Sequence, residues 1–179
     1  REHRVMTKRL DDSVAIVTGA GASGEGIGNG RGSAIRLAEE GARVALAVPL
    51  TYMNDSGRAL SALVRRFDIE TAARIVVVHD ELDLPPGVAR LKLGGGHGGH
   101  NGLRDTITHC GADFWRLRLG IGHPGDRDQV IDYVLQRPVP ADEEAIIESL
   151  GTSFDALAMF VREGSEKAMK LLHTKGSEQ

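Results

Sequence analysis

A short apolar run that ends in glycines constrains the fold of this 179-residue chain more than any other feature. Residues 14–17, Val-Ala-Ile-Val, predict a buried strand. A glycine-dense loop occupies 19–32, and 33–40 then place apolar residues on one face of a helix. Residues 43–48 predict a second strand, and the short connections favour a parallel pair. The chain therefore begins with a βαβ unit.

The same alternation of strands and helices continues to the C-terminus. Apolar or alternating runs predict further strands at 75–78, 88–93 and 115–119. One-sided apolar periodicity predicts helices at 59–67, 101–109, 142–162 and 165–173. This order predicts an α/β fold with a mostly parallel, mixed sheet flanked by helices. We expect residues 14–179 to form a single domain and residues 1–13 to be a disordered N-terminal segment.

Composition limits where such a chain works and what it binds. The net charge is −3, so any nucleic-acid binding must come from a local patch rather than from the whole surface. There is one cysteine, which excludes a disulfide within the chain and suits a reducing, cytoplasmic setting. No apolar run reaches the roughly 18 residues of a membrane span. We expect a cytoplasmic monomer with no membrane contact.

The glycine loop after the first strand has the spacing of a phosphate-binding turn, Gly19-x-Gly21-x-x-Gly24. Residues 14–48 resemble the first βαβ unit of the short-chain dehydrogenases. However, the second strand is followed by Pro49 and Leu50, where a dinucleotide site needs a residue for the ribose. That family's Tyr-x-x-x-Lys is also absent. The loop is either a dinucleotide site or a strand–helix connection without a ligand, and we expect no cofactor.

Four later segments carry a second resemblance. They are Pro-Leu-Thr-Tyr-Met-Asn-Asp-Ser-Gly at 49–57, His-Asp-Glu-Leu-Asp-Leu-Pro-Pro-Gly at 79–87, the glycine-rich run at 90–104, and 114–125. In order and spacing these segments resemble bacterial peptidyl-tRNA hydrolases, and the resemblance covers 49–179. It implies that family's fold, hydrolysis of the ester between a peptide and the terminal ribose of tRNA, and the tRNA acceptor stem as partner.

The resemblance also assigns roles to individual residues. Asp80, Asn54 and Asn101 correspond to catalytic positions, with Asp80 as the carboxylate that orients the catalytic histidine. Substrate-binding positions are Tyr52 and Met53, which form the cleft wall, together with Asn54, His100 and Asn101. From the residues alone, Asn54 could instead cap a helix and Asp80 could be an ordinary turn residue. The glycines before His100 would let its loop move over a substrate.

A local basic stretch fits an RNA partner. Residues 88–120 hold five Lys or Arg and two Asp, a balance of +3. By resemblance, Arg90, Lys92 and Arg118 meet acceptor-stem phosphates, although the stretch could also be a solvated strand face. The histidines have no spacing typical of a metal site, so we expect no metal.

One element of the hydrolase pattern is missing. The family's catalytic histidine follows its first strand and turn, but this chain has no histidine between His3 and His79. Asp80 is therefore expected to lack an imidazole partner, and hydrolysis to be absent or weak. Two rival functions stay open, an NAD(P)-binding module built on 14–48 and a non-catalytic tRNA-binding protein. A histidine within hydrogen-bond reach of Asp80 would restore the enzyme interpretation.

Overall fold

A computed structural model describes residues 14–19 and 43–175 of the chain. These residues form a five-stranded sheet in the order β2-β1-β3-β5-β4. The strands are β1 (Val14–Gly19), β2 (Arg43–Ala47), β3 (Ile75–Glu81), β4 (Ala89–Leu93) and β5 (Trp115–Gly120). Neighbouring strands are parallel except β4, which pairs antiparallel with β5 at the edge. The predicted strands and the parallel β1–β2 pair are confirmed, whereas the helix predicted at 33–40 lies outside the described residues.

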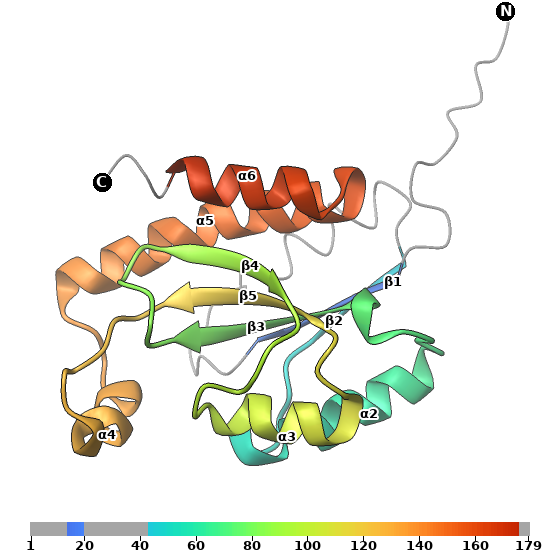
Figure 1. The fold of residues 1–179 in the computed structure, drawn as a ribbon, viewed down its shortest axis with the longest axis horizontal. Helices are drawn as coiled ribbons and strands as arrows, with labels where there is room; N and C mark the ends of the chain where they lie inside the picture. The colour runs from blue at the N-terminus through green and yellow to red at the C-terminus, as the bar shows by residue number, and fades with distance from the viewer. Residues whose placement is uncertain (1–13, 20–42, 176–179) are drawn as a thin grey trace, which may run out of the picture.

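Helices cover both faces of this sheet (Figure 1). One face carries α2 (Ser56–Arg66) and α3 (Asn101–Cys110), and the other carries α5 (Pro140–Glu163) and α6 (Ser165–Lys175). The short helix α4 (Val130–Leu135) lies beyond the end of the sheet, and one-turn helices η1 (Met53–Asp55), η2 (Ala72–Arg74) and η3 (Arg127–Gln129) complete the set. The α/β prediction of a mixed sheet flanked by helices is confirmed.

Alternation along the strands divides the core into two layers. Val76, Leu91 and Leu117 face α5 and α6, where they pack with Ala156, Leu157, Ala168 and Leu172. Ile75, Val77 and Phe114 face α2 and α3 and pack with Leu60 and Leu103. Aliphatic side chains make up most of both layers, as the low aromatic content requires. The second layer is the one that positions the site, because it fixes α3 against the end of β3.

Helices α2 and α3 cross unusually closely at Gly57. A Cβ atom at this position would lie 2.2 Å from the main-chain oxygen of Asp105 in α3. The Asp105 carboxylate accepts hydrogen bonds from the N–H groups of Gly57 (2.7 Å) and Arg58 (3.4 Å). Helix α2 has no side-chain cap from its own N-terminal residue, so α3 supplies the cap. The crossing holds η1 beside α3.

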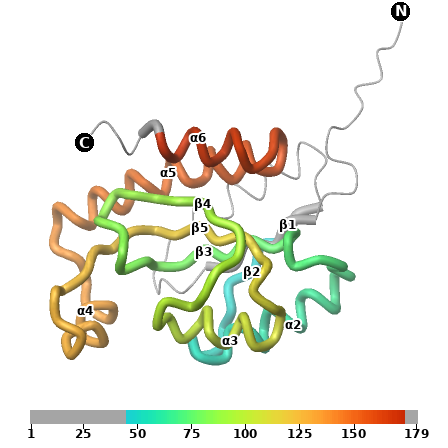
Figure 2. The backbone as a smooth tube through the Cα atoms, viewed as in Figure 1, coloured from blue at the N-terminus to red at the C-terminus, as the bar shows by residue number. Residues whose placement is uncertain are grey.

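The path of the chain brings a third segment to the same place. After β4 the backbone leaves the sheet and runs to the start of α3, on the side of the sheet that carries α2 (Figure 2). This connection is the glycine-rich segment 94–99, and four of its glycines have positive φ. The start of α3, η1 and the end of β3 therefore meet at one corner of the molecule.

We predict that Gly57→Ala lowers the free energy of unfolding by about 3 kcal/mol or more, because the new methyl group meets backbone that cannot move aside. Gly151→Ala is the matched control, since Gly151 is exposed within α5 and a Cβ there meets nothing within 4 Å. It should stabilise the protein by up to about 1 kcal/mol through helix propensity. Urea denaturation measures the free energy of unfolding of both variants. Equal changes in this free energy would contradict the close crossing of α2 and α3.

Candidate functional site

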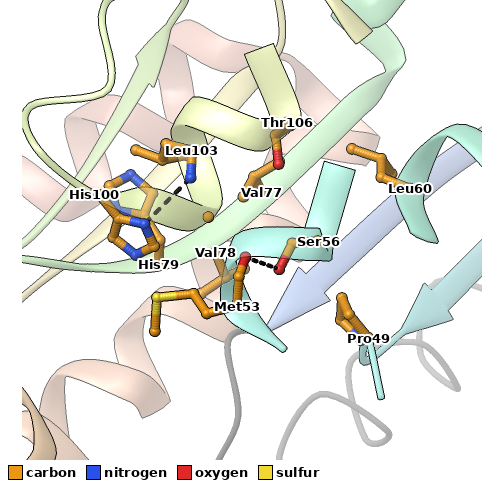
Figure 3. Close-up of a pocket in the computed structure, with 11 residues that line it drawn as sticks. Pro49, Met53, Ser56, Leu60, Val77, Val78, His79, His100, Leu103 and Thr106 are labelled. Carbon is orange, nitrogen blue, oxygen red and sulfur yellow. Dashed lines mark hydrogen bonds between the residues drawn. The ribbon is translucent and has the colours of Figure 1, made fainter. Parts of the chain in front are cut away.

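The site is built around a hydrogen bond between Asp80 and His100. Asp80 lies near the carboxyl end of β3, and His100 directly precedes α3. The distance between His100 Nε2 and Asp80 Oδ1 is 3.2 Å. The other ring nitrogen, Nδ1, accepts the Leu103 N–H at 3.2 Å and so caps α3 (Figure 3). Because Nδ1 accepts, the ring hydrogen is on Nε2 and is donated to Asp80. The expectation that Asp80 lacks an imidazole partner is therefore wrong.

This arrangement keeps Asp80 ionised. Burial alone raises the pKa of Asp80, but the hydrogen bond from His100, the electrostatic influence of the histidines and a backbone hydrogen bond together outweigh it, and the pKa lies below its usual value. The two side chains are only partly accessible, His100 at 13% and Asp80 at 31%. A carboxylate held in this way fixes the tautomer and the orientation of the imidazole.

A second histidine, His79, lies behind this pair. It is 4% exposed, its Nδ1–H donates to the main-chain oxygen of Asp80 at 2.7 Å, and its ring contacts that of His100 edge-on at 5.3 Å. Among the described residues its Nε2 has no hydrogen-bond partner. Burial lowers the pKa of His79 to about 4, so the ring is neutral at pH 7. No role for His79 is predicted from the sequence, although its place at the end of an apolar strand is a usable signal.

A small pocket opens beside the two histidines (Figure 3). Met53 extends toward His79 and His100, with Ser56 beside it and Leu103 of α3 beside His100, while Leu60 of α2 and Thr106 of α3 line the part farther from the histidines. Gly102 leaves room for this contact, since a Cβ there would lie 3.0 Å from the His100 ring and 3.1 Å from Met53. The pocket is mostly apolar, and the two imidazoles, Ser56 and Thr106 are its polar side chains.

The other predicted site residues lie around this pocket rather than in it. Asn54 is exposed in η1, and Asn101 is exposed as the first residue of α3. These two elements pack together, but neither asparagine lines the pocket. Tyr52 is 84% exposed and does not line it either. The alternative role of Asn54 as a helix cap is not observed, since Asp105 receives the first N–H groups of α2.

The three predicted RNA contacts start from one face of the sheet. In the β4–β5 register Arg90 lies opposite Arg118 and Lys92 opposite Arg116, but the Arg90 guanidinium turns around the edge strand to Leu172 of α6, on the other face. Lys92 is exposed. Arg118 donates from Nε to Glu81 at 2.7 Å, and Arg90 bonds the main-chain oxygens of Ala89 and Leu172. Arg90, Lys92 and Arg118, together called the basic patch, thus differ in how tightly the protein already holds them.

Within the described residues, no group of three or more His, Cys, Asp or Glu is arranged to hold a metal ion. No helix in the described part of the chain is both long and apolar enough to cross a membrane.

The α/β fold and the Asp80–His100 pair at one end of its sheet define the class of site, and comparison with known proteins gives the family. The family model "Peptidyl-tRNA hydrolase" matches residues 16–179, and the chain belongs to this family. A peptidyl-tRNA hydrolase of Haemophilus influenzae (strain Rd) is 49% identical over 80% of this chain and 74% of its own. One from Methylobacillus flagellatus is 55% identical over 71% and 66%. The crystal structure of the Acinetobacter baumannii peptidyl-tRNA hydrolase matches with a TM-score of 0.77 and 31% identity, covering 90% and 95%.

These comparisons bear on the N-terminal segment. The family match begins within β1 and runs on through the glycine-rich segment, so a fused dehydrogenase-like unit over 14–48 is not supported. Gly19 ends β1, where it pairs with Val78, while Gly21 and Gly24 lie outside the described residues.

We predict that His79 makes the protein acid-sensitive. An unfolded chain binds a proton at this residue below pH 6.5, whereas the folded protein binds it only below about pH 4. Stability is therefore full above pH 6.5 and falls as the pH drops toward 4, by roughly 3 kcal/mol in total, since each unit of pKa is about 1.4 kcal/mol.

His79→Gln should flatten the dependence of the free energy of unfolding on pH between 4 and 6.5, measured by urea denaturation. His123→Gln is the control, because His123 is exposed and should leave the slope unchanged. Parallel curves for His79→Gln and the unsubstituted protein would refute the assignment.

Proposed function

We propose that this protein acts on peptidyl-tRNA, hydrolysing the ester that joins the peptide to the terminal ribose. The Asp80–His100 pair at the end of β3 carries the proposal, because ester hydrolysis needs a base that an oriented carboxylate supports. The family match over residues 16–179 supports the same activity. We further infer a single α/β domain over 14–179 that works in the cytoplasm as a monomer, without a cofactor.

The proposed chemistry assigns the pair two different tasks. Asp80 holds the Nε2–H of His100, so Nδ1 is the nitrogen left to take a proton from water. That proton transfer would leave a hydroxide to attack the ester carbonyl. The bond from the carbonyl carbon to the ribose oxygen would then break, and that oxygen would take the proton back from Nδ1 to leave as the ribose hydroxyl. In the described geometry, however, Nδ1 already accepts the Leu103 N–H. The base is masked by its own helix cap, which supports the expectation of weak hydrolysis.

The remaining site residues are proposed to hold the substrate. The exposed amides of Asn54 and Asn101 can each donate to a peptide carbonyl and accept from a water or an N–H group. Met53 would form the pocket wall, and Tyr52 would offer an exposed ring at its edge for a ribose or base. Separate residues would thus bind the substrate and activate the water.

We predict that turnover of a peptidyl-tRNA is about 10² to 10⁴ times slower than in a hydrolase with an unmasked histidine, the range that general-base catalysis supplies. Asp80→Asn should abolish the residual activity. Imidazole added to the unsubstituted protein should act as an external base and partly restore its rate of hydrolysis. Release of peptide from labelled peptidyl-tRNA measures all three.

Asp83→Asn is the matched control, since Asp83 is an exposed carboxylate in the turn after Glu81. It should leave the rate unchanged. Turnover without imidazole as fast as in a hydrolase with an unmasked histidine would rule out the proposed base. Residual turnover that Asp80→Asn does not change would also rule it out.

The basic patch is proposed to meet acceptor-stem phosphates. Lys92 is exposed, and the Nη groups of Arg118 make no hydrogen bond to any described residue while Glu81 holds its Nε. Both side chains could therefore reach a phosphate without breaking an existing contact. Arg90 is bound to two main-chain oxygens, one of them in α6, and would contribute less.

We predict that Lys92→Gln and Arg118→Gln each weaken tRNA binding and reduce the slope of log K against log salt by about one. Arg90→Gln should have a smaller effect. Arg66→Gln, on the exposed end of α2, is the control and should change neither quantity. An unchanged slope for both Lys92→Gln and Arg118→Gln would place the RNA elsewhere.

Two alternatives make different predictions from these. A dinucleotide-binding module predicts saturable binding of NAD or NADP, which a titration detects directly. A non-catalytic RNA-binding protein predicts salt-dependent tRNA binding with no ester cleavage at any imidazole concentration. The family match favours neither.

A further inference from the structure

We propose that Arg116 is a positioning residue that fastens the start of the glycine loop, residues 94–99, to the sheet and thereby holds His100 against Asp80. Sequence analysis gave this arginine no role beyond its charge. The purpose of the clamp rests on the proposed function, but its existence does not.

The contacts of Arg116 are those of a fork closed on the main chain. The residue lies in β5 and is only 4% exposed. Its Nη1 donates to the main-chain oxygen of Gly96 and its Nη2 to that of Gly95. The guanidinium carbon lies 4.8 Å from the centre of the Phe114 ring, within the range of a cation–π contact. A planar group thus fixes two consecutive peptide units of the loop.

The charge of Arg116 makes these two hydrogen bonds hard to give up. Among the described residues it has no carboxylate within ion-pair distance, and burial, with the charge of Arg118 nearby, lowers its pKa. An arginine nevertheless stays protonated, so it cannot lose its charge when its acceptors leave. Releasing the Gly95 and Gly96 oxygens would leave a buried cation without these two hydrogen-bond acceptors. The loop start is therefore held more firmly than its glycine content suggests.

The clamp is close in sequence to the catalytic pair. The Gly94 N–H donates to the main-chain oxygen of Phe114 at 2.9 Å. This bond continues the β4–β5 hydrogen-bond ladder to the first loop residue. Beyond Gly96 the chain makes a tight turn, in which the His100 N–H donates to the His97 oxygen at 2.8 Å. Only three residues separate Gly96 from His100. With the clamp the loop is fixed at both ends, and without it only the Gly94 hydrogen bond would hold the start of the loop.

Amide hydrogen exchange tests the clamp without requiring activity. Arg116→Lys keeps the charge but loses the planar fork, and Arg116→Gln loses both. We expect amides 95–101 to exchange at least tenfold faster in either variant, with the core amides of α5 and α6 unchanged. Arg90→Lys is the matched control. Arg90 lies in the neighbouring strand β4 and also donates to main-chain oxygens, those of Ala89 and Leu172, which lie outside the loop. This variant should leave loop exchange unaltered.

A uniform rise in exchange across the sheet would make Arg116 an ordinary core residue, and an unchanged loop would overturn the proposal. If neither variant folds, the unsubstituted protein still decides the question. NMR of its arginine side chains should show Arg116 Nη groups with hindered rotation and scalar couplings to the Gly95 and Gly96 carbonyls. Freely rotating Nη groups would contradict the clamp.

A second readout asks whether Arg116 acts through His100. Arg116→Lys should weaken binding of an acceptor-stem RNA in the unsubstituted chain, but should have no further effect in a His100→Ala background. Equal weakening in both backgrounds would separate Arg116 from His100 and overturn the positioning role. If neither chain binds the RNA, the proposed function fails, while the exchange result still stands or falls on its own.

Discussion

The imidazole of His100, held between the Asp80 carboxylate and the Leu103 N–H, joins the sheet to helix α3 and organises everything around it. One ring nitrogen donates to the end of β3 and the other accepts from the first turn of α3, so a single side chain fixes two elements and one tautomer. The same bonds lower the pKa of Asp80 and engage the nitrogen that catalysis would need. The lone pair of His100 Nδ1 can either accept the Leu103 N–H, which caps α3, or accept a proton from water, but not both at once.

Two further constraints keep that imidazole in place. The close crossing at Gly57 sets α3 beside α2, with Asp105 of one helix capping the other, and so brings Met53 against the histidine. The Arg116 fork, as proposed, holds the loop from which His100 emerges. Three segments distant in the sequence therefore meet at one corner, where backbone contacts add to the apolar layer that packs α2 and α3 on the sheet. Such contacts tolerate little movement, which suits a site made of a few hydrogen bonds.

Much of this could be predicted from the sequence because it depends on local pattern. Apolar runs give the strands, and motif order gives Asp80, His100 and the two asparagines as neighbours. Contacts between segments could not be predicted in the same way. Nothing in the local sequence indicates that Arg118 pairs with Glu81, that Arg90 reaches α6, or that Asp105 caps α2. The expectation that Asp80 lacks a partner failed because it considered only the position where the family places its histidine, and not His100. The dehydrogenase-like pattern at the N-terminus reflects the common chemistry of a strand followed by a glycine turn, which many α/β folds share.

The state of the His100 ring tests this account most directly. Long-range ¹⁵N–¹H NMR of the histidine side chains at neutral pH distinguishes the two tautomers of a neutral imidazole and detects exchange between them. The account predicts a single, fixed tautomer for His100, protonated at Nε2 and bonded to Asp80, with an Nδ1 that carries no hydrogen. A ring protonated at Nδ1, or one that averages between tautomers, would show that the Asp80 and Leu103 bonds do not hold it and would contradict the account.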